Sequence, residues 1–458
     1  MSATETGSSS ASLTQKVLAR ARDFRHGTSE ASITNRNAST VFIIRVISAV
    51  LAYISQIILA RWMGVSDYGI YVYVWTWVLI LGSLLDFGMA PAAQKVIPEY
   101  RALGNFDGLR GYLTGARWMA FAGCCIVCAL IACGIYLMTP RLPQAMVFPL
   151  YLACITLPAF VVANVQDATS RAWDWMRLGL TPTFIIRQSL IIAFTGAVLA
   201  AGLKLDAAGA MIASAIAVWV AMIGQLVFLN RRLATVVPAG PRRYEGKSWL
   251  ATSLPIVLTE GTFLLLSYTD VLMLQQFRPP EDVGIYFAVV KTLVLVSFIH
   301  YAIGASTAHR FSELHATGDK KRLEDFVAYS IKVMFWPSLA VTILLLIAGK
   351  PMLWLFGPQF VDGYGMMFVM AIGLVVRAAV GPVERLLNML GKQHVCAVAY
   401  GLAFLVNFTM GLLLIPAYGG YGAAAALSIA LVFLTVVLFY VAKTRLGLHV
   451  LPFGRSKS

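Results

Sequence analysis

Apolar stretches of about 20 residues recur along almost the whole chain. A helix of this length crosses a hydrocarbon core of roughly 30 Å and hydrogen-bonds all of its own backbone groups there. Only 12% of the residues are charged, whereas about a quarter are charged in a soluble domain. The sequence therefore predicts an all-α integral membrane protein with about 12 transmembrane helices. The runs are residues 40–60, 69–90, 112–138, 146–166, 179–202, 207–229, 250–273, 283–305, 328–349, 364–384, 396–416 and 421–442.

The basic residues predict how these helices are oriented. With the N-terminus inside, 25 of the 36 Lys and Arg residues fall in the tails and loops of one side, and five fall in the opposite loops. Positive residues in short loops are retained in the cytoplasm, so we expect both termini to be cytoplasmic. The net charge of +15 then follows from loops at a membrane surface, where anionic lipids are the expected partner and nucleic acid is not.

An internal repeat divides the chain at a spacing of about 215 residues. The segment Asp67-Tyr68-Gly69-Ile70-Tyr71 returns as Asp282-Val283-Gly284-Ile285-Tyr286, and the small residues after Gly209 return after Gly422. Each half holds six predicted helices, which makes the repeat parallel, with a substrate cavity expected between two lobes. The expected parts are a cytoplasmic tail (1–38), an N-lobe (39–230), a cytoplasmic linker (231–249), a C-lobe (250–443) and a second cytoplasmic tail (444–458).

Several short motifs resemble a known family. They are Ile58-Leu59-Ala60-Arg61, Met63-Gly64, Asp67-Tyr68-Gly69-Ile70-Tyr71, Leu85-Asp86-Phe87-Gly88-Met89 and Asn388-Met389-Leu390-Gly391-Lys392. In these the chain resembles, over roughly residues 38–445, the Wzx-like O-antigen and exopolysaccharide flippases. These form the polysaccharide transport family of the multidrug/oligosaccharidyl-lipid/polysaccharide flippase superfamily.

The resemblance implies a function in the bacterial inner membrane. It implies that an undecaprenyl-pyrophosphate-linked oligosaccharide is flipped from the cytoplasmic to the periplasmic leaflet, with polysaccharide polymerase and chain-length proteins as partners. It implies no enzyme and no cofactor. The sequence agrees, since it contains neither a Gly-rich phosphate loop ending in Gly-Lys-Ser or Gly-Lys-Thr nor a paired-His metal helix. H+ or Na+ is then the expected coupling ion, or the substrate gradient drives the movement.

Basic residues inside the predicted helices are the candidates for binding the pyrophosphate. Arg187, Lys291 and Arg377 lie deep in their helices, and Arg45 lies about five residues into its helix. Buried charges are costly, so such residues face a cavity or pair with an acid, and both readings stay open for the first three. Arg45 is also placed where its side chain can reach the headgroups. Arg117 and Lys332 lie closer to the helix ends, where anchoring at the membrane surface is expected.

Embedded acids are the candidates for ion coupling. Glu260 lies in the middle of its predicted helix and Asp270 lies nearer the periplasm. A coupling site needs a buried carboxylate that is neutralised during part of the cycle, and a structural salt bridge is the alternative for Glu260. Asp86 belongs to the Asp-Phe-Gly turn, so we expect it to be structural. The aromatic residues at 71, 73, 75 and 77 are expected at the membrane interface or facing lipid, with sugar stacking as the alternative.

Two other functional classes compete with a flippase. An ion-coupled multidrug exporter of the same superfamily would need an acidic cavity for organic cations, but six embedded bases outnumber four embedded acids here. A membrane-embedded glycosyltransferase or polymerase would need a large loop with catalytic carboxylates, and the longest loops here span about 20 residues.

Overall fold

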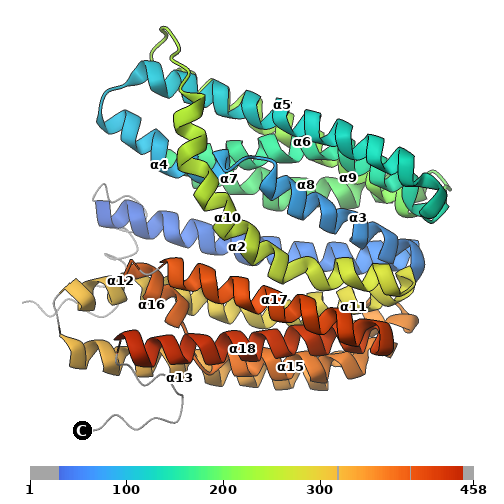
Figure 1. The fold of residues 1–458 in the computed structure, drawn as a ribbon. Helices are drawn as coiled ribbons and strands as arrows, with labels where there is room; N and C mark the ends of the chain where they lie inside the picture. Colours follow the sequence, from blue (N-terminus) through green and yellow to red (C-terminus); the bar gives the residue numbers. More distant parts are fainter. Residues whose placement is uncertain (1–29, 317–318, 392, 447–458) are drawn as a thin grey trace, which may run out of the picture.

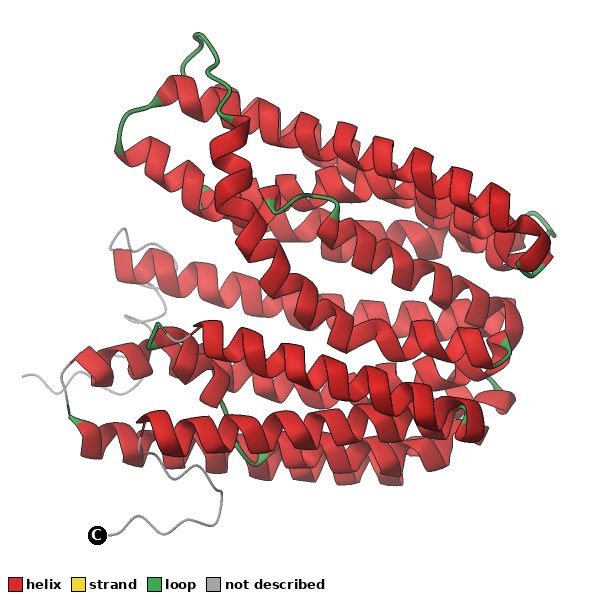
Figure 2. Ribbon diagram, viewed as in Figure 1, coloured by secondary structure: helices red, strands yellow, loops and turns green. Residues whose placement is uncertain are grey.

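The computed structural model describes residues 30–316, 319–391 and 393–446, and every regular element in this part of the chain is a helix (Figure 2). The first half contains α2 (Glu30–Met63), α3 (Val65–Leu84), α4 (Met89–Ala102), α5 (Phe106–Met138), η1 (Thr139–Arg141), α6 (Gln144–Ala172), α7 (Met176–Thr181), the π-helical turn η2 (Pro182–Ile186), α8 (Arg187–Ala200) and α9 (Ala207–Ala234).

The second half repeats this plan with more breaks. It contains α10 (Gly246–Phe277), α11 (Pro280–Leu293), η3 (Val294–Val296), α12 (Ser297–Ala316), α13 (Lys320–Ile347), α14 (Gly349–Phe356), η4 (Pro358–Gly363), α15 (Tyr364–Ala378), α16 (Val383–Met389), α17 (Gln393–Tyr418) and α18 (Gly420–Leu446).

Eleven helical segments in the described residues are long and apolar enough to cross a membrane. They correspond to eleven of the twelve predicted runs. The remaining run, 250–273, falls within α10, which has 32 residues and is long enough to span, although several of its side chains lie outside the described part. The prediction of an all-α membrane protein is therefore confirmed.

Two boundaries differ from the sequence prediction. Helix α2 begins at Glu30, ten residues before the apolar run, so part of the predicted tail is helical. The run 69–90 is broken between α3 and α4, where Phe87 and Gly88 take positive φ angles of 51° and 73°. Asp86 stabilises this break, because its Oδ1 accepts a hydrogen bond of 2.7 Å from the Gly88 amide. The structural role expected for Asp86 is confirmed.

The helices form two bundles that meet at one end and separate toward the other (Figure 1). Helices α3 to α9 form the upper bundle in this view and α11 to α18 form the lower one. At the converging end, α3 packs directly on α11 through the repeated glycines. A Cβ on Gly69 would lie 1.8 Å from the Pro280 carbonyl oxygen, and one on Gly284 would lie 2.7 Å from that of Val65. Only glycine allows these backbones to approach so closely.

The first helix of each half crosses from one bundle to the other. Near its start α10 contacts the upper bundle, where Ser253 Oγ donates a 2.7 Å hydrogen bond to the Phe87 carbonyl; its later part packs on α17. Helix α2 packs on α8, and at its far end Arg61 donates to the carbonyls of Trp354 and Leu355 in α14. Each of these two helices therefore contacts both bundles.

Candidate functional site

Arg187 places a cation inside the upper bundle. It is the first residue of α8, directly after the π-helical turn η2, and its side chain is half-buried. The guanidinium carbon lies 5.2 Å from the ring centre of Phe160 on α6 and 6.0 Å from that of Trp75 on α3. Its Nε is buried and makes no hydrogen bond within the described residues. Aromatic faces attract a cation but do not neutralise it.

Arg45, on the crossing helix α2, lies beside the same π-helical turn as Arg187. Its guanidinium carbon is 4.3 Å from the ring centre of Phe184, which precedes Arg187 by one turn of η2. Asp167 on α6 lies close enough for an electrostatic interaction with Arg45, although Asp167 pairs directly with Arg171 at 3.1 Å. Arg45 and Arg187 therefore flank the π-helical turn, and Arg45 has an acid nearby.

Lys291 places the corresponding cation in the lower bundle. It lies on α11, and its Nζ is 4.5 Å from the ring centre of Phe287, one turn earlier on the same helix. The next residue, Thr292, forms a hydrogen bond of 3.2 Å with Tyr53 of α2, so this turn of α11 also faces the crossing helix. Within the described residues, no carboxylate lies within 4.0 Å of the nitrogens of Lys291 or Arg187.

These two cations lie at a similar depth. Trp75, which contacts Arg187, follows Gly69 on α3 by about 9 Å at 1.5 Å per residue. Lys291 follows Gly284 on α11 by about 10 Å on the same scale. Both cations therefore lie about two helical turns from the glycine contact, on the side away from the converging end. One belongs to each bundle.

Arg377 lies in a different place. It ends α15 and donates from Nη2 to Glu384 Oε2 at 2.7 Å, while the Tyr400 hydroxyl donates to the same oxygen. The two charged side chains are 14% and 27% exposed, so this ion pair is largely buried. Together with His300 they line a cavity of about 400 Å³ between α10 and the helices of the lower bundle. Arg45, Arg187 and Lys291 do not line this cavity, although Val290 and Leu293, close to Lys291 on α11, do. Tyr400 was not identified from the sequence, because an isolated tyrosine in an apolar run carries no signal.

The two candidate acids differ in what the structure describes. Asp270 on α10 is buried, its Oδ2 accepts a hydrogen bond from the Tyr286 hydroxyl of α11, and its Oδ1 accepts one of 2.9 Å from the Val271 amide. None of the described basic side chains pairs with it. The side chain of Glu260 lies outside the described residues, so its role stays a prediction.

Two of the four aromatic residues of α3 are buried, instead of lying at the membrane interface or facing lipid as the sequence predicts. Tyr71 and Tyr73 are 2% and 9% exposed, because α3 is enclosed by α6, α10 and α11. Tyr71 stacks on Trp75, and its hydroxyl forms a 3.0 Å hydrogen bond with Ser214. These rings support the position of Trp75 beside Arg187.

Comparison with known proteins agrees with this architecture. The profile of the family described as "Polysaccharide biosynthesis protein" matches residues 35–315, and that of the MatE family matches residues 255–413. The chain is 22% identical over 410 residues to the probable low-salt glycan biosynthesis flippase Agl15 of Haloferax volcanii, covering 88% of this chain and 82% of that protein.

Two solved structures share the fold. One is an inward-facing multidrug resistance MATE family transporter of the MOP superfamily, with a TM-score of 0.74 and 14% identity, covering 89% of this chain and 98% of the other. The second is the lipid II flippase MurJ in an inward closed conformation, with a TM-score of 0.69 and 15% identity, covering 88% of this chain and 87% of MurJ. These relatives are transporters and flippases, as the sequence predicted. The chain therefore belongs to the family described as "Polysaccharide biosynthesis protein", and it shares its fold with these two transporters.

Proposed function

We propose that this protein flips an undecaprenyl-pyrophosphate-linked oligosaccharide from the cytoplasmic to the periplasmic leaflet of a bacterial inner membrane. Both termini face the cytoplasm in this proposal. The converging end, with the Gly69–Gly284 contact, then faces the periplasm, and the bundles separate toward the cytoplasm, where the substrate is made.

The observation that carries the proposal is the pair of cations, Arg187 and Lys291, that lack an acidic partner in the described residues. An uncompensated charge away from water is costly, so its retention is intelligible when the natural ligand is anionic. A pyrophosphate supplies that charge. The Arg187 guanidinium can hold two phosphate oxygens at once, and Lys291 adds a point charge from the opposite bundle.

Movement of the substrate follows from the contacts between the bundles. In the proposed cycle the pyrophosphate enters between the bundles and binds Arg187 and Lys291, while the lipid tail stays in the bilayer. The bundles then separate at the Gly69–Gly284 contact and close at the opposite end. Because α2 and α10 contact both bundles, they bend or slide during this exchange.

Ion coupling is assigned to Asp270, with Glu260 as the second candidate. Asp270 suits this role because its described partners are a tyrosine hydroxyl and a backbone amide, and neither neutralises its charge. Binding H+ or Na+ would do so. Tyr286 lies two residues after Gly284, so a change at Asp270 is transmitted directly to the contact between the bundles.

Asp270→Asn should remove the dependence of transport on the ion gradient. If the dependence is unchanged, the role passes to Glu260, and Glu260→Gln tests it in the same assay.

The deciding experiment is complementation of a flippase-deficient strain, with membrane abundance measured for each variant. Arg187→Ala and Lys291→Ala should each abolish surface polysaccharide at near wild-type abundance. Lys332→Ala, which removes an exposed cation from α13, is the matched control and should complement fully. Arg187→Lys should retain partial activity, because it keeps the charge and loses the two-oxygen contact. Wild-type polysaccharide from both Ala variants would overturn the proposal.

Drug export is the second candidate function, since the MatE profile matches residues 255–413 and the MATE transporter shares the fold. Arg187 and Lys291, which have no acidic partner among the described residues, argue against organic cations as substrates, because like charges repel. Efflux of a cationic dye by cells expressing this protein, lost in Asp270→Asn and unchanged in Arg187→Ala, would favour the exporter over the flippase.

A further inference from the structure

A second basic cavity lies in the upper bundle, apart from the site described above. It measures about 440 Å³ and is bordered by α5, α6, α9 and the linker that follows α9. Its polar lining includes Arg117, Arg242 and Asn230, and its apolar lining includes Trp118, Phe121 and Leu226. None of the described lining residues is acidic. The cavity thus combines positive charge with an apolar wall.

Both arginines retain unused hydrogen-bonding capacity. Arg117 donates from Nε to the Leu113 carbonyl and from Nη1 to Asn230 Oδ1 at 2.8 Å, but its Nη2 has no partner among the described residues. Arg242 is exposed and makes no hydrogen bond or ion pair with any described residue, and it lies close enough to repel the charge of Arg117. Two like charges without a carboxylate between them favour an anion.

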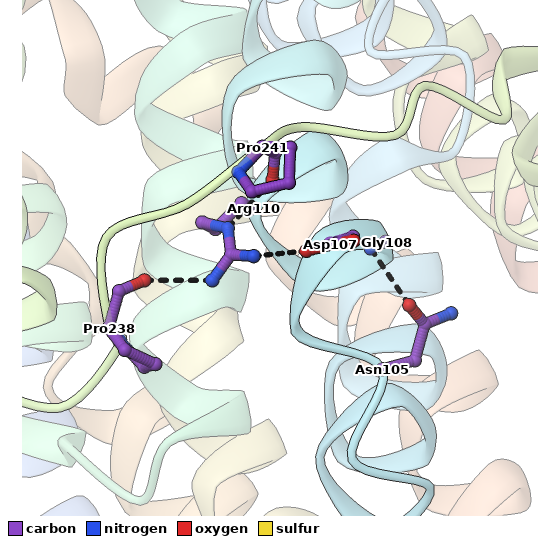
Figure 3. Close-up of polar contacts among 6 residues, drawn as sticks. All are labelled: Asn105, Asp107, Gly108, Arg110, Pro238 and Pro241. Carbon is purple, nitrogen blue, oxygen red and sulfur yellow. Dashed lines mark hydrogen bonds and ion pairs between the residues drawn. The ribbon is translucent and has the colours of Figure 1, made fainter.

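The linker is held in place, so the position of Arg242 is not accidental. Figure 3 shows Arg110 of α5 binding the linker through the carbonyls of Pro238 and Pro241, each at 2.8 Å, while its Nη2 pairs with Asp107. The Arg243 amide also donates to the Asp107 carbonyl at 3.0 Å. The residues on both sides of Arg242 are therefore fixed to α5, which directs this part of the linker to the cavity.

The cavity lies at the depth of a lipid headgroup. The rise of α5 from Arg117 to its last residue, Met138, is about 31 Å at 1.5 Å per residue, close to the roughly 30 Å of a hydrocarbon core. If Met138 lies at one interface, Arg117 lies at the other. Trp118, which is 64% exposed, is then also at an interface, where tryptophan is favoured.

We propose that this cavity binds the phosphate of an anionic membrane phospholipid, with Arg117 and Arg242 on the phosphate and an acyl chain against Phe121 and Leu226. The bound lipid bridges α5, α9 and the linker. Because α10 begins immediately after the linker, the lipid also helps to fix the start of the helix that crosses between the bundles.

Native mass spectrometry of the full-length protein, released from nanodiscs, tests this proposal. Discs would contain equal amounts of phosphatidylglycerol and phosphatidylcholine, two lipids that share the phosphate and differ in net charge. The wild type should retain about one phosphatidylglycerol, and Arg242→Gln should lower this occupancy at least tenfold. Arg231→Gln is the matched control, because Arg231 is an exposed residue of α9 that does not line the cavity.

The outcomes separate the possible ligands. Equal loss in Arg231→Gln and Arg242→Gln would show general attraction to the membrane and overturn the site. Equal retention of the two lipids would overturn selectivity for an anionic lipid. Inorganic phosphate at 10 mM should not displace the lipid; displacement would show that the cavity takes free phosphate.

Arg242 lies in an exposed linker, so its substitution should leave the fold intact, and an unchanged melting temperature checks this. Since neither Arg187 nor Lys291 lines this cavity, the result is independent of the proposed flippase function.

Discussion

Replacing Gly69 by alanine should weaken the contact that holds the bundles together at the converging end. The added Cβ would lie 1.8 Å from the Pro280 carbonyl oxygen and 3.2 Å from the Gly284 amide nitrogen. An ordinary contact begins at 3.4 Å, so α3 and α11 would have to separate by about 1.6 Å. The obstructing atoms belong to the backbone and cannot rotate away.

Two free-energy terms change in Gly69→Ala, but only one of them differs between the two states of the bundles. Alanine favours the helix over glycine by about 1 kcal/mol, whatever the state of the bundles. Overpacking a close contact costs about 1–3 kcal/mol, and this cost applies only while α3 and α11 touch. The ratio of the two states should therefore shift by roughly 5- to 150-fold toward the form that is open at this end. Transport should fall, because the cycle needs both states.

Pulsed electron paramagnetic resonance in nanodiscs can measure this shift. Spin labels at Leu203, in the loop after α8, and at Tyr418, the last residue of α17, should report a longer distance in Gly69→Ala, because both positions are exposed and lie near the converging end in different bundles. Gly224→Ala is the control, because a Cβ there meets no atom within 4 Å. A distance distribution and a transport rate equal to those of the control, in a protein that carries Ala at position 69, would refute the argument.

Three further predictions test other parts of the structure. For topology, thiols placed at Arg141 and Arg278 should be labelled from outside intact cells, and those at Lys247 and Arg322 should not; labelling of the second pair would invert the orientation. Glu384→Gln should lower stability by about 1–3 kcal/mol, less than for a fully buried pair because Glu384 is 27% exposed, and adding Arg377→Met should recover part of the loss in thermal unfolding; additive losses would contradict the pairing. Arg110→Ala should increase hydrogen exchange of the amides of residues 239–245 by at least tenfold, whereas Arg231→Ala should not, and equal protection in both would show that Arg110 does not hold the linker.

The spans could be predicted from the sequence because the membrane imposes a simple rule on length and hydrophobicity. The repeat around Gly69 and Gly284 was also visible, since a short loop and a glycine at a fixed spacing leave a recognisable pattern. That these two glycines contact each other was not, because a motif repeated in two halves does not show how the halves face one another.

Other features depend on tertiary contacts that leave no pattern. The crossing of α2 and α10 between the bundles could not be predicted, since an apolar helix looks the same whichever bundle it joins. The sequence also does not distinguish Arg187, Lys291 and Arg377, because all three are basic residues deep in predicted helices. Their difference lies in Glu384, which reaches Arg377 only because the chain turns between α15 and α16. Pairing, and with it the separation of structural from available cations, is decided by such turns.

The two available cations break the symmetry of the fold. At the repeat spacing of 215 residues, the position in α3 that corresponds to Lys291 is Thr76, whose hydroxyl is buried and donates to the Val72 carbonyl at 2.8 Å. The first half instead supplies its cation from α8, through Arg187.

A symmetric pair of cations would hold a pyrophosphate equally well in either direction. A lipid-linked oligosaccharide is not symmetric, since one phosphate carries the lipid and the other carries the sugar. An arginine on one side and a lysine on the other distinguish the two phosphates, because only the arginine makes a planar contact with two oxygens. Exchanging them, as Arg187→Lys with Lys291→Arg, keeps the total charge and reverses this preference. The double variant should therefore be less active than Arg187→Lys alone in the complementation assay, and equal or greater activity would show that only the charge at this depth matters.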